Sequence, residues 1–496
     1  MVGLFTHTNF KSSYTREPVF GLLVGGVKQN VVVSPSIATS ILSSPKASSA
    51  AVIDYLTENV FGDKGAIRHL KPSDFREFQK AGTLHDPFST EALRSEICLI
   101  ERETSNLVSF CRSPVDQGLW ERASRVTVID NTDPLICEAN LFSLVRDFTA
   151  YVTTSVFMGQ AFVESSFPGL EDLWAVDNNF ISLFSGVPRW FPSSGVSSAH
   201  PARQRLLNKL AIFHQSVVDW HDGKDPGVEF RDLDDVSEHM KERILISKRL
   251  GLSPYASASG HMSQLWSLLR HTPKIVFWNL IHIHADRKLL EDIRKEIMPY
   301  AKASRPNPQE TGFPIPEPPK LVIDVKGLQE SCPLLTASYY ETLRLHSAGV
   351  SFRQLTSDLD VAESESDAVR DGLTKPRKYG LKKGDYVAIS HGAHQRDTRY
   401  FQNPTQYNHR RFMNAESETS EKTAVAHTFT PFHDDVFEAK DHSFMQSEIL
   451  AFTAAILSLW EISPAGGGEW NIPGNKSTIG VFPPSKDVRV RMKIRV

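Results

Sequence analysis

Apolar residues at helical spacing dominate the chain from residue 135 to residue 460. They recur every three or four positions, which predicts amphipathic or buried helices. The segments with this pattern are 135–160, 205–220, 235–250, 262–281, 285–299, 330–346 and 443–460. Strand patterns are short and sit outside these helices, at residues 19–33 and 377–390. The expected fold is therefore mainly α with small β-sheets, and not an alternating βαβ arrangement.

Local turn and cap signals define the N-terminal part more closely. Residues 19–33 predict a hairpin around Gly25-Gly26, inside a β-rich region of about 14–35. Ser34-Pro35 has the form of an N-cap followed by a first-turn proline, which predicts a helix over roughly 36–44. The Pro-rich stretch 302–320 is interpreted as a surface loop and not as a domain boundary, so residues 1–496 are predicted to form a single domain.

Composition excludes several classes of protein. The 55 Lys and Arg residues nearly balance the 58 Asp and Glu residues, so a dedicated nucleic-acid surface is not expected. The four cysteines, Cys98, Cys111, Cys137 and Cys332, are too sparse for a disulfide scaffold or a zinc site. The first 30 residues contain no apolar run near 18 residues, so no transmembrane segment or secretory signal is expected. These features predict a soluble, cytoplasmic protein.

Three segments in the C-terminal half carry a specific resemblance. They are ETLRLH (341–346), NPTQYNHRRFM (403–413) and TPFHDDVFEAKDHSFMQSEI (430–449). In this order and spacing they resemble the cytochrome P-450 family. Glu341 and Arg344 match its ExxR motif, and Arg411 matches the third member of its buried triad, although His409 stands where a Pro is usual. Residues 265–278 resemble the family's central helix, and the C-terminus resembles fungal biosynthetic members. The resemblance implies a cytochrome P-450 fold for the whole chain.

The loop that holds haem in this family is altered here. The spacing from Pro431 to Glu448 matches the family's loop, but the position of its iron-ligating cysteine is Ala439, and two loop glycines are replaced by His433 and Asp435. Since the family's chemistry depends on that thiolate, its loss implies that haem is absent. His442 also stands where the family has an arginine that holds a haem propionate, whereas Arg353 still matches a propionate-binding position.

The central helix differs from the family pattern as well. Ser267 and Leu268 occupy the small-residue pair that makes room for oxygen, and His271 and Thr272 occupy the acid or amide and the threonine. At helical spacing Leu268, His271, Thr272 and Ile275 share one face, which borders the pocket in the resembled fold. A lone His on such a face is more often a satisfied core residue, and a Thr often bonds to the carbonyl four residues earlier.

The altered loop, residues 433–442, leaves alternatives open. Its two His and four carboxylates suggest a metal site, but a charged loop is more often solvated and no ligand spacing is present, so no metal is predicted. His433 or His442 is an alternative haem ligand. Arg353 would face the vacated haem cavity, where it either pairs with a carboxylate of this loop or binds an anionic or carbonyl group of a substrate.

These observations favour an enzyme that works without haem. The hypothesis is a cyclisation or isomerisation, including pericyclic closure, of a small lipophilic polyketide, terpenoid or alkaloid intermediate, with no redox partner. His271, Thr272 and Arg353 are the candidate catalytic residues, and the candidate pocket consists of Ser267, Leu268, Ile275, Ala439 and His433. Two alternatives remain: a haem oxygenase or isomerase with a substituted ligand, and a non-catalytic binding or scaffold homologue.

Overall fold

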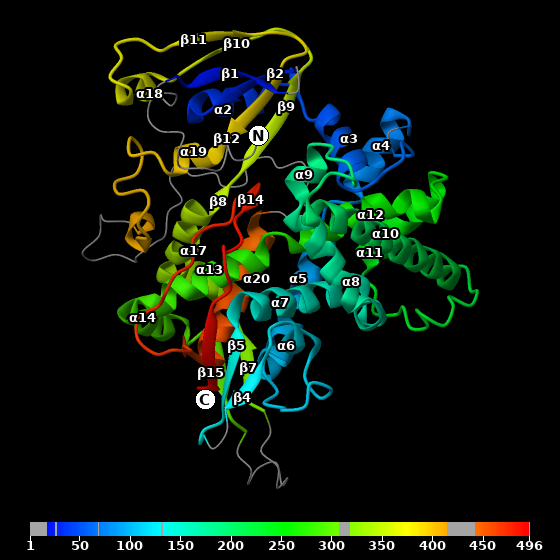
Figure 1. The fold of residues 1–496 in the computed structure, drawn as a ribbon, viewed down its shortest axis with the longest axis vertical. Coiled ribbons are helices and arrows are strands. Elements are labelled where there is room, and N and C mark those ends of the chain that lie inside the picture. The colour runs from blue at the N-terminus through cyan, green and yellow to red at the C-terminus, as the bar shows by residue number, and fades with distance from the viewer. Residues whose placement is uncertain are drawn as a thin grey trace.

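The computed structural model describes residues 17–24, 27–67, 69–129, 132–306, 318–413 and 442–495. Along the longest axis of the molecule, a sheet with short helices occupies one end and helices fill the middle (Figure 1). A second sheet, which carries the last strand of the chain, lies at the other end (Figure 1). This mainly helical architecture with small sheets agrees with the fold class expected from the apolar spacing.

The first sheet contains the expected N-terminal hairpin. Its five strands lie in the order β1 (Val19–Val24), β2 (Val27–Val32), β12 (Tyr386–Ser390), β9 (Val350–Leu355) and β3 (Ala47–Ser48). β1 and β2 pair antiparallel from Val19 opposite Val32, while β12 runs parallel to β2. The Gly25-Gly26 turn lies outside the described residues, as do residues 14–16 of the expected β-rich region. The two predicted strand regions, 19–33 and 377–390, are confirmed.

The helix after the hairpin starts where its cap signal indicates. α2 spans Pro35–Leu42, and the Ser34 hydroxyl accepts a hydrogen bond from the Ile37 amide at 3.5 Å. A proline at the first helical position loses nothing, because that amide would have no partner within the helix. Ile37 and Ile41 pack with Val32 and Leu355 in a small apolar cluster against the sheet. β10 (Leu359–Ala362) and β11 (Lys378–Leu381) form a separate hairpin beside it.

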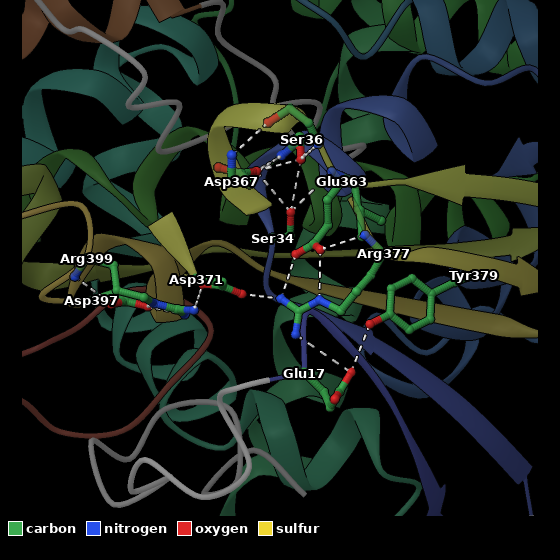
Figure 2. Close-up of polar contacts among 12 residues, drawn as sticks. Glu17, Ser34, Ser36, Glu363, Asp367, Asp371, Arg377, Tyr379, Asp397 and Arg399 are labelled. Atoms are coloured by element: carbon green, nitrogen blue, oxygen red, sulfur yellow. Dashed lines mark hydrogen bonds and ion pairs between the residues drawn. The ribbon is translucent and has the colours of Figure 1, made fainter. Parts of the chain in front are cut away.

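A network of ion pairs connects this hairpin to the chain beyond β12 (Figure 2). Arg377 binds Glu363 through two hydrogen bonds of 2.8 Å each and also contacts Asp371. Asp371 is shared with Arg399, which in turn pairs with Asp397. Bidentate arginine–carboxylate pairs constrain geometry more than single contacts do. The network therefore holds α18 (Glu365–Arg370), which lies between these residues in the sequence, against the rest of the sheet region.

The helical part surrounds one central helix, α13 (Thr272–Ala285), which contacts α7, α17 and α20. The other helices are α3 (Ala50–Asn59), α4 (Pro72–Lys80), α5 (Phe88–Glu103), α6 (Leu119–Ala123), α7 (Leu141–Met158), α8 (Gln160–Asn178), α9 (Phe180–Phe184), α10 (Ser194–His221), α11 (Glu238–Arg249), α12 (Pro254–Leu269), α14 (Arg287–Ile297), α16 (Val325–Ser331), α17 (Pro333–His346), α19 (His391–Gln395) and α20 (His442–Leu459). The predicted helices at 205–220, 235–250, 285–299 and 443–460 are confirmed as α10, α11, α14 and α20.

Three further sheets are small. The sheet at the far end has the order β13 (Trp460–Pro464), β15 (Arg489–Ile494), β5 (Ile136–Asn140) and β4 (Thr127–Ile129). Two short pairs complete the set: β14 (Gly480–Val481) with β8 (Ser347–Ala348), and β6 (Ala301–Ser304) with β7 (Lys320–Ile323). The Pro-rich stretch 302–320 thus begins and ends in strands, while residues 307–317 lie outside the described part. The expectation of a loop is wrong at both ends of that stretch.

Three predicted helices are broken or shortened. The segment 135–160 begins with strand β5, because Cys137 and Ala139 alternate into the core beside β15 before α7 starts. The segment 330–346 is divided at Cys332, ahead of Pro333, and the segment 262–281 is divided at Arg270 and His271, ahead of Pro273. Proline supplies no amide to the preceding turn and disfavours helical geometry in the residue before it. No helix in the described ranges is both long and apolar enough to cross a bilayer.

Candidate active site

The break between α12 and α13 places two candidate residues at a helix start. His271 is the N-cap of α13 and Thr272 is its first residue, so Leu268 and Ile275 lie on different helices. The prediction of one continuous helical face is therefore wrong, because Pro273 interrupts it. His271 and Thr272 are nevertheless both buried, with exposed fractions of 3% and 2%.

Thr272 directs its hydroxyl to a buried carboxylate. Its Oγ1 donates to Glu448 Oε2 on α20 at 2.8 Å, instead of bonding back to the preceding turn of its own helix. The other oxygen of Glu448 lies 3.1 Å from the hydroxyl of Thr153 on α7, and that hydroxyl is 2.6 Å from Glu96 on α5. Glu96 and Glu448 are both fully buried. Four helices thus contribute to one chain of hydroxyl and carboxyl groups that ends at the candidate site.

Sequence reasoning did not find this chain. Glu448 was used only as the last matched position of the altered loop, and Thr153 and Glu96 sit within apolar helical patterns. One signal was available, because a charged residue such as Glu448 in a strongly apolar helix is rarely buried without a partner. Its partners come from three other helices, so helical spacing could not identify them.

His271 lies against a strand from the C-terminal part of the chain. A Cβ atom added to Gly480 of β14 would approach His271 Cε1 to 2.8 Å, and Gly480 has a φ angle of +86°. Any other residue here would be strained and would also push against the imidazole. β14 pairs with β8, which directly follows the ExxR helix α17. The imidazole is therefore held where the central helix meets this strand pair.

The remaining candidate pocket residues divide between two places. Ile275 and Leu268 are buried in the main core, with exposed fractions of 0% and 2%. Ser267 lines a separate cavity of about 310 Å³ between α3, α4, α11 and α12. Ala439 and His433, and with them residues 430–441 of the altered loop, lie outside the described residues.

Arg353 is on β9, with an exposed fraction of 4%. Its Nη1 donates to the Phe352 carbonyl at 2.8 Å, and its backbone lies opposite Val387 of β12. β8 and β9 are consecutive along the chain, so Arg353 lies five residues beyond Ala348, the partner of Gly480. His271 and Arg353 are therefore related only through a series of elements, in which His271 contacts Gly480 of β14, β14 pairs with β8, and β9 follows β8.

The three residues of the expected triad lie together. Arg344 makes two hydrogen bonds of 2.8 Å to Glu341, and Arg411 Nε approaches the same carboxylate at 3.2 Å. Glu341 also accepts from the Asn408 amide at 2.8 Å, and Arg344 donates to the Pro404 carbonyl at 2.7 Å. Since Glu341 and Arg344 are fully buried, this cluster connects α17 rigidly to the segment around residues 404–411.

The cysteines decide whether this chain fits a thiolate-ligated haem. All four lie before residue 333, and none is on α20 or in the segment that precedes it. Burial raises the pKa of Cys137 and of Cys332 to about 12, so both are protonated thiols at neutral pH. In the described ranges no group of three His, Cys, Asp or Glu side chains is arranged to hold a metal ion. The segment 430–449, which resembles the family's haem loop, therefore contains no cysteine.

Comparison with known proteins shows a similarity over part of the chain. Residues 276–432 match the family model described as Cytochrome P-450. Relatives include the cytochrome P-450 monooxygenase poxD of Penicillium oxalicum, 24% identical over 71% of this chain and 63% of its own length. A cytochrome P-450 monooxygenase of Gibberella zeae is 22% identical over 67% of this chain and 56% of its own length.

A third relative is animal. The 25-hydroxycholesterol 7-alpha-hydroxylase of Rattus norvegicus is 22% identical over 52% of this chain and 59% of its own length. The chain thus spans between 56% and 63% of the length of these curated relatives. The family model matches from within α13 to beyond the Glu341–Arg344–Arg411 cluster, so it includes Arg353 but begins after His271 and Thr272. Residues 276–432 of the chain are thus similar to the cytochrome P-450 family, and the three relatives are 22–24% identical to it over the aligned residues.

Proposed function

We propose that this protein works without haem and catalyses the cyclisation or isomerisation, in some substrates pericyclic, of a small lipophilic polyketide, terpenoid or alkaloid intermediate. The observation that carries the proposal is the cysteine distribution. Ala439 stands at the aligned ligand position, and the four cysteines all lie elsewhere. Without a thiolate ligand the oxygen chemistry of the family lacks its electron donor. An isomerisation involves no net oxidation or reduction, so the proposed reaction needs no redox partner. The proposed location is cytoplasmic.

In the proposed reaction His271 contacts the substrate. Its imidazole, held against Gly480, would donate a hydrogen bond to a substrate carbonyl or accept a proton from an adjacent carbon. Thr272, the next residue, would hold or return that proton because its hydroxyl is backed by the Glu448 carboxylate at 2.8 Å. Arg353 would orient an anionic or carbonyl group of the substrate. Holding the reacting atoms in one geometry supplies the rest of the acceleration.

The first experiment is an absorption spectrum with metal analysis of protein produced with ample haem. The proposal expects no Soret band and no stoichiometric iron. Turnover of candidate intermediates is then compared for the wild type and for His271→Ala, with His221→Ala as a control, since the His221 side chain is 54% exposed. We expect His271→Ala to lower the turnover rate about tenfold or more and His221→Ala to leave it unchanged. Full turnover by folded His271→Ala would remove His271 from the site.

A second candidate function is a haem oxygenase or isomerase with a substituted axial ligand. It is favoured by the printed names of the two fungal relatives, which are monooxygenases. A Soret band with about one iron per chain would replace the first proposal with this one. If the protein holds no haem and turns over no intermediate, the non-catalytic binding homologue remains.

A further inference from the structure

The cavity that contains Ser267 has an unusual charge balance. It lies between α3, α4, α11 and α12 and encloses about 310 Å³. Two cations, Lys80 and Arg243, are among its lining residues, while no Asp or Glu from the described part of the chain lines it. Phe75 and Phe78 contribute apolar surface. Such a cavity favours a ligand that is apolar along its length and negatively charged at one end.

Arg243 is the deeper of the two cations. It has an exposed fraction of 4%, and it donates to the carbonyls of Phe78 at 3.3 Å and Gly260 at 3.0 Å. Its Nε has no hydrogen-bond partner, and no carboxylate of the described residues pairs with it. The Phe78 ring lies 4.7 Å from its guanidinium carbon, and the buried His239 and His261 are close enough for their pKa values to be lowered by its charge. Burial lowers the pKa of Arg243 to about 10, so the group is still charged at neutral pH.

The surrounding backbone leaves room for this guanidinium. A Cβ atom on Gly82 would overlap Arg243 Nη1, and one on Gly260 would lie 2.5 Å from the Phe78 ring and 3.1 Å from Nη2. Both glycines thus allow the charged group to sit between α4 and α12. A buried charge without a counter-charge is costly, and two carbonyls and a ring offset only part of that cost. An anion supplied by a ligand would remove the imbalance.

Gln264, which also lines the cavity, carries a second buried polar atom without a partner. Its exposed fraction is 4%, and its Nε2 lies 2.9 Å from His239 Nε2, whereas its Oε1 has no partner. An amide oxygen in this state accepts a hydrogen bond from a ligand hydroxyl. The cavity therefore presents one charged donor and one neutral acceptor, both buried, beside aromatic surface.

We infer that this cavity binds the carboxylate end of a lipophilic acid, with Arg243 pairing with the carboxylate and Gln264 accepting from a neighbouring hydroxyl. The assignment of that acid as the substrate rests on the proposed function, but its binding does not. Ser267, which lines the cavity, precedes His271 by four residues, across the break between α12 and α13. From Gly260 to Ser267, the lining residues of α12, the helix rises about 10 Å, so the acid would be elongated.

The test measures binding and not turnover, so it is independent of the proposed reaction. Hexadecanoate, hexadecan-1-ol and hexadecyl phosphate are titrated into the full chain below their critical micelle concentrations, with tryptophan fluorescence as the readout. We expect the wild type to bind hexadecanoate at least about tenfold more tightly than the alcohol, as a charge-assisted contact predicts. Equal affinity for acid and alcohol would overturn the inference, and this comparison needs no variant. Tighter binding of the phosphate than of the acid would overturn the choice of carboxylate.

Two variants of the same helix locate the site. Arg243→Gln removes the buried charge and should abolish the preference for the acid, whereas Arg249→Gln should leave it unchanged. Arg249 is a matched control because it is also on α11 but is 64% exposed and pairs with Glu77. A preference that persists in folded Arg243→Gln would place the anion elsewhere and overturn the inference. If only the reaction proposal is wrong, the acid still binds and the charge dependence remains.

Discussion

A pair of stacked histidines makes the stability of this protein sensitive to acid. The Nε2 atoms of His282 and His346 lie 2.7 Å apart, and His346 Nδ1 lies 2.7 Å from Asn475 Oδ1. Because that amide oxygen accepts the Nδ1 proton, His346 is neutral with Nε2 as the acceptor, and His282 donates to it. Trp278 stacks on His346 at 3.8 Å and Tyr407 stacks on His282 at 4.1 Å. A second proton has no place in this arrangement.

The size of the effect follows from the pKa of one group. Burial lowers the pKa of His282 from its ordinary 6.5 to about 3. Above pH 6.5 both folded and unfolded states are neutral, so His282 contributes no pH dependence there. Below pH 6.5 the unfolded state takes up a proton that the folded state refuses, so stability falls as pH drops toward 3. Between pH 7.5 and pH 5 this single group costs about 2 kcal/mol.

The assay is urea unfolding followed by tryptophan fluorescence, at pH 7.5 and at pH 5. His282→Gln keeps an amide donor for His346 but cannot titrate, so its free energy of unfolding should fall by about 2 kcal/mol less than that of the wild type over this interval. His85→Gln is the control. Because the His85 side chain is exposed, the free energy of unfolding of this variant should fall between pH 7.5 and pH 5 as much as that of the wild type. An equal drop in the wild type and in His282→Gln would refute the reasoning.

Three other substitutions test the packing around the candidate site. Glu341→Gln leaves the buried guanidinium of Arg344 without its charge partner and should lower the free energy of unfolding by about 3–5 kcal/mol in urea titrations; a loss below about 1 kcal/mol would contradict this. Thr272→Val takes the hydroxyl donor from a buried carboxylate and should cost about 1–3 kcal/mol by the same measurement, whereas unchanged stability would disprove the bond. Gly480→Ala adds a methyl group that would displace His271 and should reduce turnover of a bound substrate. Turnover equal to that of the wild type would contradict this expectation.

Local sequence signals were sufficient to predict several parts of this fold. The β1–β2 hairpin, the start of α2 at Ser34-Pro35 and the helices at 205–220, 235–250, 285–299 and 443–460 follow from turn residues, caps and apolar periodicity. These signals act over a few residues and involve only the chain's own backbone. The resemblance to the family also followed from motifs of residue type and spacing, because Glu341 and Arg344 lie one helical turn apart on α17 and Arg411 follows in the segment 403–413.

The sequence by itself thus determined the fold class, the resemblance to the cytochrome P-450 family and the alanine at position 439. Only the tertiary structure decided that the central helix breaks before Pro273, that Thr272 bonds to Glu448, and that buried Arg243 pairs with no carboxylate of the described residues. The physical reason is the range of the interactions. Periodicity and capping depend on neighbours in the chain, whereas burial and the pairing of charges depend on groups that folding brings together from distant helices.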